Sequence, residues 1–384
     1  MRLKQMYWFA ETLFILERKQ GITGFCRIAR KMFVSKINEV KEDVMKKMYV
    51  CSLGVLFLCL ALLTGASYGA DKVIKLELAS YLPATEPVNV TLQDWCKEVE
   101  KRTNGRVTVT LHPGATLVPM VQTYESVANG MVDIGFAAFG YTPGRFPMME
   151  LLDLPTGLKT SVLAAKLATD YVAKFKPKEL QDVKILYLFA TSPALIHTKK
   201  PIRKLEDLKG MKIRTVGGMM VNLVQSLGAV PVVIPTVDTY DAASKGVIDG
   251  TYSAWPGLVT FKWGEVLPYT VGNYRTAPAA IQFVVMNKEK WNALPPDVQQ
   301  IFDKLSEEYL VKSAQTFDQF TADAERALAA AKHTTTSLSR EEDDRWFKAV
   351  APVYDLYIKD KSAKGLPAAE AYNFVQDWVK KNQK

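Results

Sequence analysis

The chain contains few of the residues that build disulfides and metal sites. It has three histidines and four cysteines in 384 residues. Three of the cysteines lie in the first 70 residues, which leaves Cys96 alone in the rest of the chain. A single thiol forms no internal disulfide, and its place beside Trp95 in a helical pattern favours a buried structural thiol. The histidines have no ligand-like spacing and no cysteine cluster beside them, which argues against a transition-metal site.

Catalytic and cofactor motifs are missing as well. The sequence contains no G-x-S-x-G elbow, no P-loop and no G-x-G-x-x-G after a strand. No acidic, basic or nucleophilic residues form a recognisable catalytic set. Asp133 and Asp249 end two similar helical patterns, so we expect capping or structural roles for them. The sequence therefore predicts a protein that binds without turnover and is not an enzyme, with no cofactor and no metal.

The positive charge of the chain is concentrated at its front. The whole chain has 49 Lys+Arg and 40 Asp+Glu, a net charge of +9. Residues 1–70 hold eleven basic and five acidic side chains, so residues 71–384 hold 38 and 35, a net charge of +3. This small excess argues against a basic surface for nucleic acid.

Residues 45–70 have the pattern of a secretory signal peptide. Met45-Lys46-Lys47-Met48 supplies the charged start, an uncharged apolar run follows to about residue 63, and small residues end the segment. The run of about 15 residues is short for a bilayer span of roughly 20, which favours cleavage over an uncleaved anchor. Residues 1–44 are either a start-site artefact or an extended n-region. We expect export to the periplasm and, since no second run of 18 apolar residues follows, a soluble product.

The chain after the signal begins with a strand–helix–strand pattern. Residues 74–78 alternate between apolar and charged, residues 92–99 have helical spacing that ends at Asn104-Gly105, and residues 107–111 alternate again. Such a unit implies a parallel sheet and the α/β class.

An internal repeat is the most informative feature of the organisation. TYESVANGMVD at 123–133 returns as TYDAASKGVIDG at 239–250, an offset of 116 residues. A weaker echo sets Gly105 before residues 106–111 and Gly210 before residues 211–216. This spacing predicts two similar α/β lobes, because a solenoid has a period of roughly 20–50 residues.

A long helical pattern follows Pro295-Pro296. Apolar residues keep near-helical spacing to about Ala331. One helix of this length would be longer than a lobe and could tie both lobes together. Two shorter helices are the alternative, since no cap divides the pattern.

Arg214 ends the short strand predicted for KGMKIR. Ligands of parallel sheets bind near the carboxyl ends of strands, where this guanidinium would lie. A guanidinium holds a carboxylate through two parallel hydrogen bonds, which lysine does not reproduce. Composition alone would make Arg214 a solvated surface charge.

Several motifs together resemble a known family. The signal peptide, A-S-Y-L-P, N-G-R-V-T-V, G-M-V-D-I-G, L-K-G-M-K-I-R and G-V-I-D-G are similar to solute-binding proteins of tripartite ATP-independent periplasmic (TRAP) transporters, dicarboxylate-type branch. The resemblance covers residues 72–380. It implies a two-lobed α/β periplasmic binding protein (Venus-flytrap) fold with hinge strands and a lobe-spanning helix. Lobe I would comprise 71–190 plus 281–318, and lobe II 191–280 plus 319–384.

The resemblance also implies a ligand site. Arg214 would clamp the ligand carboxylate. The sequence departs from the family pattern where Ala194 replaces a second basic residue, where Thr236 replaces an aromatic residue, and where Thr251-Tyr252-Ser253 replaces Gln-Glu-Asn. These changes favour a monocarboxylate with an apolar or aromatic body over a dicarboxylate or sialic acid.

The remaining site residues are assigned by position. Tyr81 and Tyr141 follow strand ends of the first lobe, and Tyr252 and Trp255 lie in the second. We expect these aromatic side chains to wall the cleft, and Ser253 to donate to the second carboxylate oxygen. His197 lies near the site, and the sequence leaves open whether it faces the cleft.

The resemblance implies a monomer that closes over an organic acid and delivers it to a TRAP membrane permease. The alternatives are a binding protein of an ATP-driven importer for an amino acid or other solute, and a secreted α/β hydrolase.

Overall fold

The computed structural model describes residues 73–383 and, before them, positions 4, 5, 8, 11, 12, 15, 24, 28, 31, 32, 34–46 and 48. The chain divides into two compact units, Met1–Asp71 and Lys72–Lys384. In the first unit, residues 34–46 are helical. Residues 49–70 of the predicted signal peptide lie outside the described residues. In the part of the chain that the structure describes, no helix has both the length and the apolar composition of a membrane span.

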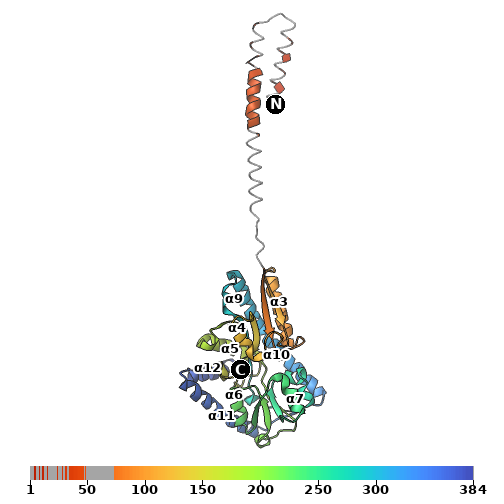
Figure 1. Ribbon diagram of the computed structural model, residues 1–384, viewed down its shortest axis with the longest axis vertical. Coiled ribbons are helices and arrows are strands. Elements are labelled where there is room, and N and C mark those ends of the chain that lie inside the picture. The colour runs from red at the N-terminus through yellow and green to blue at the C-terminus, as the bar shows by residue number, and fades with distance from the viewer. Residues whose placement is uncertain are drawn as a thin grey trace. The chain divides into compact units, whose positions relative to one another are not determined.

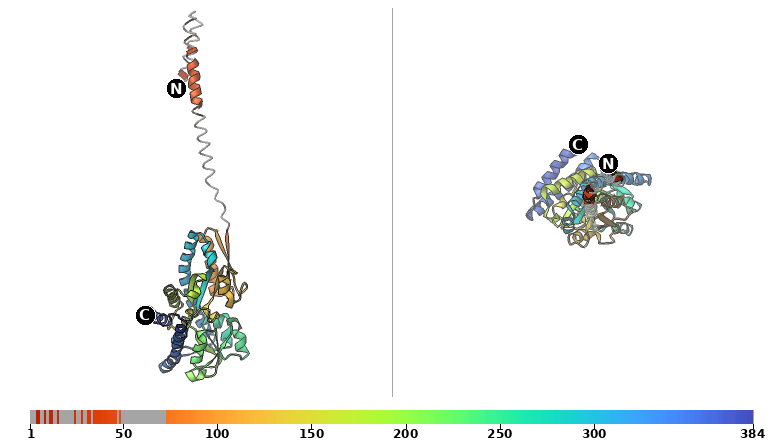
Figure 2. Two further views of the ribbon diagram at one scale, coloured as in Figure 1. Left: turned by 60° about the vertical axis from the view of Figure 1, so that its left-hand side comes forward. Right: turned by 90° about the horizontal axis from the view of Figure 1, so that it is seen from above.

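The second unit is built on two β-sheets (Figures 1 and 2). The first sheet has the order β2-β1-β3-β10-β4, with β1 Ile74–Ser80, β2 Val107–His112, β3 Ile134–Ala138, β4 Val183–Ala190 and β10 Ile281–Asn287. The second has the order β11-β9-β5-β8-β6-β7, with β5 Leu195–Thr198, β6 Lys212–Thr215, β7 Val230–Val233, β8 Gly250–Ser253, β9 Tyr269–Val271 and β11 Thr334–Thr336.

Helices surround both sheets. Those that follow strands of the first sheet are α3 Pro87–Arg102, α4 Thr123–Ala128, α5 Ser161–Phe175 and α9 Lys288–Asn292. Those that follow strands of the second sheet are α6 Met219–Ser226, α7 Thr239–Ser244 and α8 Pro256–Thr260. The C-terminal part contains α10 Pro296–Ala330, α11 Arg340–Ala363 and α12 Ala368–Asn382. Figure 1 labels most of them.

Local sequence explains where α3 begins and ends. The Glu86 side chain accepts a hydrogen bond from the backbone N–H of Val88, and Pro87 fixes the first helical residue. Leu92, Trp95 and Val99 recur at helical spacing and are buried in the core. The chain then turns at Asn104 and Gly105, both of which have positive φ. The predicted helix is confirmed.

The internal repeat corresponds to a repeated fold. The segment β1-α3-β2-α4-β3 and the segment β6-α6-β7-α7-β8 both place their first strand between the other two, in parallel pairs. Asp133 accepts from the backbone N–H of Glu77 at 2.8 Å, and Asp249 accepts from that of Lys212 at 2.9 Å. Each repeat aspartate thus fixes the first strand of its own repeat, which agrees with the predicted structural role.

The predicted correspondence between Gly105 and Gly210 is wrong. Gly105 precedes β2, the second strand of the first repeat, whereas Gly210 precedes β6, the first strand of the second repeat. Topology makes Gly228, which precedes β7, the counterpart of Gly105. Two turns before short strands look alike in sequence because both need a residue with positive φ.

Two extended segments connect the sheets. Residues 191–194 follow β4 and lead to β5, while residues 277–280 precede β10. The two segments run side by side, because Thr191 N–H donates to Ala280 O at 3.0 Å and Ala194 N–H donates to Pro278 O at 2.7 Å. A paired crossing of this kind can act as a hinge between two lobes.

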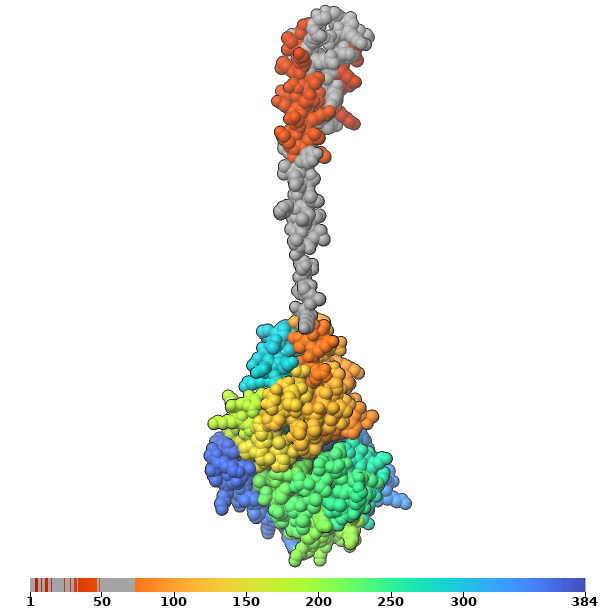
Figure 3. All heavy atoms as spheres, viewed as in Figure 1, coloured from red at the N-terminus to blue at the C-terminus, as the bar shows by residue number. Residues whose placement is uncertain are grey.

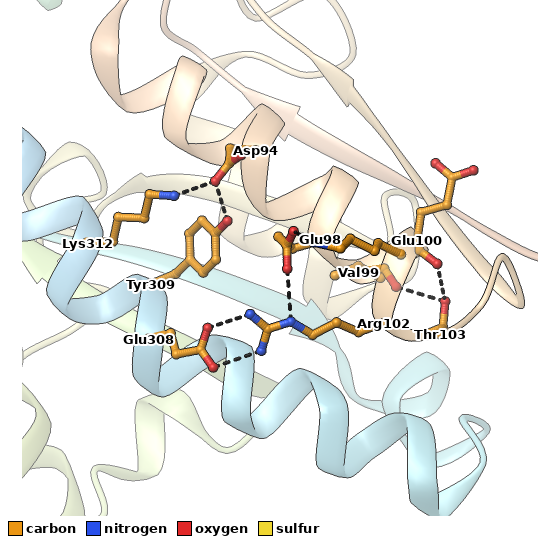
Figure 4. Close-up of polar contacts among 10 residues, drawn as sticks. Asp94, Glu98, Val99, Glu100, Arg102, Thr103, Glu308, Tyr309 and Lys312 are labelled. Carbon is orange, nitrogen blue, oxygen red and sulfur yellow. Dashed lines mark hydrogen bonds and ion pairs between the residues drawn. The ribbon is translucent and has the colours of Figure 1, made fainter.

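Helix α10 is a single helix of 35 residues, so the alternative of two shorter helices is wrong. It packs against α3 and α5 beside the first sheet and against α8 beside the second. A polar seam joins it to α3 (Figure 4): the Arg102 guanidinium donates to both carboxylate oxygens of Glu308, at 2.8 and 2.6 Å, and Lys312 pairs with Asp94.

Helix α12 departs from the predicted lobe boundary, whereas α11 packs against α6 of the second lobe and also reaches the first. Residues 319–384 were expected in the second lobe, but α12 packs against α5 of the first. Trp378 Nε1 donates to Asp170 on α5 at 2.7 Å, and Tyr357 on α11 donates to the carbonyl of Pro147 at 3.2 Å. The sequence pattern of an amphipathic helix does not specify which lobe its apolar face will cover, so this boundary needed the tertiary structure.

Candidate functional site

The strand ends of the two sheets enclose one cavity of about 130 Å³. Its wall comes from both sheets and from the crossing segments between them. Apolar groups make up much of it, including Leu82, Ala138, Met220, Phe261 and Phe317. The cavity therefore lies between the two lobes, at the carboxyl ends of parallel strands, where ligands of α/β sheets bind.

Arg214 is the cation of this cavity. It lies on β6 with 3% of its surface exposed. Its Nε donates to Ile234 O at 2.8 Å and its Nη2 donates to Thr236 Oγ1 at 3.0 Å. These bonds use two of the five guanidinium donors, and within residues 73–383 no carboxylate forms an ion pair with it. Burial lowers the pKa of Arg214, yet a guanidinium keeps its charge.

A chain of hydroxyl groups connects Arg214 to the first lobe. Tyr141 forms a hydrogen bond with Thr236 Oγ1 at 3.2 Å and donates to the hydroxyl of Tyr81 at 3.3 Å. The rings of Tyr81 and Tyr141 meet edge to face, 5.3 Å apart. Tyr81, Tyr141 and Thr236 all line the cavity, and their contact with a ligand stays a prediction. The guanidinium is thus oriented by the same hydroxyls that join the two lobes.

Two buried carboxyl groups also line the wall. Glu86 and Asp153 are 6% and 7% exposed. Burial raises the pKa of each to about 7. Glu86 accepts from the Val88 N–H at 2.7 Å, while Asp153 accepts from the Ile281 N–H at 3.4 Å. The wall contributed by the first lobe can therefore change its charge near neutral pH.

Tyr252 and Ser253 end β8 and line the cavity. The Tyr252 hydroxyl donates to the carbonyl of Thr276 at 2.7 Å, so only its ring is available to a ligand. No described residue forms a hydrogen bond with the hydroxyl of Ser253. This leaves Ser253 free to donate to a carboxylate.

His197 does not serve the cavity. Its Nε2 donates to the carbonyl of Ser253 at 2.9 Å, and its Nδ1 forms a hydrogen bond with Thr270 Oγ1 at 2.7 Å. Burial lowers the pKa of His197 to about 3, so the ring is neutral. Both ring nitrogens are used within the fold.

The predicted position of Trp255 is wrong. Its ring lies 5.5 Å from that of His197, and its Nε1 donates to the hydroxyl of Tyr274 at 3.3 Å, beside a separate hollow. The chain leaves β8 at Ser253, so the alternation of a strand no longer sets the direction of Trp255. Trp263, which follows α8, lines the cavity instead.

Sequence reasoning also missed polar residues of the wall. Glu86, Asp153, Thr215 and Gln282 come from four separated segments, and only tertiary packing brings them to one cavity. Gln282 did carry a signal, since it is the polar residue inside the otherwise apolar run IQFVVM. Ala194, the position of the missing second basic residue, lies in the wall as well.

Known proteins match this arrangement. The profile of the family described as bacterial extracellular solute-binding protein, family 7, matches residues 78–360. The chain belongs to this family. The C4-dicarboxylate-binding periplasmic protein DctP of Rhodobacter capsulatus is 28% identical to this family 7 protein over 284 residues, 71% of this chain and 83% of its own.

Solved structures agree with that assignment. A marine metagenome TRAP solute-binding protein specific for aromatic acid ligands, crystallised with 3-hydroxybenzoate, is 29% identical and has a TM-score of 0.77 over 81% of this chain and 99% of its own. A TRAP solute-binding protein from Rhodoferax ferrireducens T118, in complex with copurified benzoate, is 25% identical and has a TM-score of 0.76, with 80% and 98% covered. The predicted family, the α/β two-lobed fold and the solute-binding function of this family 7 protein are confirmed.

Proposed function

We propose that this family 7 protein captures a monocarboxylic acid with an apolar or aromatic body, clamps its carboxylate with Arg214 and delivers it to a TRAP membrane permease. The observation that carries the proposal is a buried guanidinium that faces a small cavity and has no carboxylate partner among the described residues. An unpaired buried charge is costly, and a ligand carboxylate removes that cost. The pair would be bidentate, which fixes the orientation of the ligand as well as its charge.

The size of the cavity favours a single ring. Its volume of about 130 Å³ is close to the ~150 Å³ of an apolar cavity that binds benzene. The structural relatives named above bind benzoate and 3-hydroxybenzoate. A ring in this space would contact the aromatic and aliphatic wall. Each Å² of apolar surface buried there contributes about 25 cal/mol to the free energy of binding.

The charges of the wall disfavour a dicarboxylate, although the Rhodobacter relative is named for binding one. Among the described residues that line the cavity, Arg214 is the one cationic side chain. A second ligand carboxylate would face Glu86 or Asp153 instead of a cation. Like charges at close range oppose each other strongly in a buried site.

Binding would proceed by closure of the lobes. An open form admits the acid, and contacts with both lobes then favour the closed form. Closure removes water from the ion pair and strengthens it. One clamp and one apolar ring can supply the roughly −8 kcal/mol of a micromolar complex. The ligand leaves chemically unchanged, since the protein acts in transport.

The compartment and the partner follow from this function. Export through the segment 45–70 would place the protein in the periplasm, as a monomer that meets the permease in its closed form. The family description, an extracellular solute-binding protein, supports this location.

Calorimetry with benzoate tests the proposal. Arg214→Ala should weaken binding at least tenfold, and Arg214→Lys should also weaken it because lysine makes no bidentate pair. Arg203→Ala is the matched control, since Arg203 is exposed on the same lobe and lies outside the cavity. Equal affinity of Arg214→Ala and Arg203→Ala for benzoate would remove the assigned role, and so would tighter binding of succinate than of benzoate by the unmodified protein.

A further inference from the structure

One amide oxygen in the cavity wall has no hydrogen-bond partner among the described residues. Gln282 lies on β10, a central strand of the first sheet whose seven residues are all buried. It is 4% exposed, and no described residue donates a hydrogen bond to its Oε1. A buried polar group without a partner loses its hydration and gains no hydrogen bond, which destabilises the fold. Native proteins leave few such groups, and each calls for an explanation.

The surroundings of Gln282 are apolar. It pairs with Ala138 on β3 and with Phe189 on β4. Beside it, Phe136 stacks on Phe189 at 5.7 Å, and Tyr81 stacks on Phe136 at 5.5 Å. Of these residues, Tyr81 and Ala138 line the cavity, so a ligand ring beside Gln282 would be held mainly by apolar contact. The amide of Gln282 is the exception, because it can form a hydrogen bond only with a polar group of the ligand.

Four other polar side chains of the wall have partners within the fold, and the free hydroxyl of Ser253 is assigned above to the ligand carboxylate. The hydroxyls of Tyr252 and Thr236 have partners within the fold, and Glu86 and Asp153 accept backbone hydrogen bonds. Thr215 Oγ1 is the second orphan, and it adjoins Arg214 at the end of β6. Thr215 therefore belongs with the carboxylate end of the ligand.

The two orphans lie on different sheets. Thr215 is on the second sheet beside the cation, while Gln282 is on the first sheet, and both line the same cavity. A ligand whose carboxylate is held by Arg214 extends its body toward the first sheet. The group that meets Gln282 is then a substituent on that body.

We propose that Gln282 binds a hydroxyl on the ligand body, which makes hydroxy-substituted aromatic monocarboxylates the preferred ligands. The inference rests on the proposed function. A hydroxyl donates to the amide oxygen and can also accept from the amide nitrogen, so it satisfies the side chain in either direction. An unsubstituted ring leaves the amide unpaired, and a site built for a hydroxyl discriminates strongly against such an analogue.

Calorimetry on the purified protein tests the inference with benzoate, the three monohydroxybenzoates and 3-chlorobenzoate, which adds bulk without a donor. The unmodified protein should bind at least one hydroxybenzoate tenfold or more tightly than both benzoate and 3-chlorobenzoate. Gln282→Met has similar length and no hydrogen-bonding group. It should reduce that preference to within about twofold and leave benzoate affinity equal or higher.

Two further measurements keep the test specific. Gln282→Met should retain or raise the melting temperature, because it replaces an unsatisfied amide with an apolar group. Gln319→Met is the control: Gln319 lies on α10 outside the cavity and bonds to Asp323. It should keep the preference of the unmodified protein.

The outcomes separate the two proposals. If benzoate binds through Arg214 but no hydroxybenzoate is preferred over 3-chlorobenzoate, the role of Gln282 is overturned and the proposed function stands. The same holds if Gln282→Met keeps the full preference. If neither benzoate nor any substituted benzoate binds, both the proposed function and this inference fail.

Discussion

The two repeats share a topology but differ in how they treat their polar groups. In the register set by the repeat aspartates, Lys212 of β6 corresponds to Glu77 of β1, because Asp249 and Asp133 bind their backbone N–H groups. Arg214 then corresponds to Ala79. The first repeat thus places a methyl group where the second places the buried cation.

The next position shows the same difference. Thr215 corresponds to Ser80 in this register. The Ser80 hydroxyl donates to Asn89 Oδ1 at 2.6 Å, whereas Thr215 Oγ1 has no partner among the described residues. The first repeat satisfies its polar group internally and the second leaves it available. The groups proposed to bind the ligand therefore lie where the symmetry of the fold is broken, and the symmetric aspartates each bind a strand backbone.

The largest expected effect concerns those aspartates. Asp133 is buried and also pairs with Lys290, while Asp249 is half-buried. Asp133→Ala should lower the free energy of unfolding by about 1–3 kcal/mol, since it leaves a strand N–H unpaired inside the protein. Asp249→Ala should cost about 1 kcal/mol or less. Urea unfolding measures both.

The replacement Asp133→Asn is the control, because it keeps an acceptor oxygen for the Glu77 N–H. It should recover most of the lost stability. Equal losses for Asp133→Ala and Asp249→Ala would contradict the difference in burial on which the comparison rests.

The second prediction concerns the contact between the lobes. A Cβ at Gly217, just after β6, would lie 2.5 Å from Pro143 Cγ of the first lobe, and φ at Gly217 is +151°. In Figure 3 the yellow surface of the first lobe lies directly against the green surface of the second. Gly217→Ala should weaken ligand binding at least tenfold, because the added methyl keeps the lobes apart. Its positive φ should also lower the melting temperature of the ligand-free protein, as in the control below.

Gly228→Ala provides the matched control. Gly228 also has positive φ, at +82°, but a Cβ there would meet nothing within 4 Å. This variant carries the backbone strain alone, about 1 kcal/mol or more, without the contact between lobes. Equal ligand affinity in the two variants would show that the Pro143 contact does not limit closure.

The comparison also explains what the sequence could and could not predict. The repeat, the long helix and Arg214 were accessible because each depends on local spacing or on a motif within one segment. Trp255 and the position of α12 were not, because both depend on where the chain turns after an element ends. Glu86 and Gln282 join the site through packing between distant segments, and no local pattern encodes that.

The third prediction uses the difference in charge between the two walls. The second lobe supplies a permanent cation, Arg214, and the first supplies Glu86 and Asp153, whose pKa values burial raises to about 7. Because these pKa values lie above those of an unfolded chain, the folded protein holds more protons between about pH 4 and pH 7, and stability falls as pH rises through that window.

Ligand affinity should fall as the pH rises, because the same two carboxyl groups become anionic. Below about pH 6 the two carboxyls are neutral, whereas above about pH 8 they are anionic and oppose a ligand carboxylate. We expect the dissociation constant for benzoate to rise about three- to tenfold between pH 6 and pH 8. Asp153→Asn keeps the shape and an acceptor for the Ile281 N–H, so it should flatten this dependence. If the affinity of the unmodified protein for benzoate does not fall between pH 6 and pH 8, the first-lobe wall does not titrate in this range. The second lobe alone then sets the charge of the site.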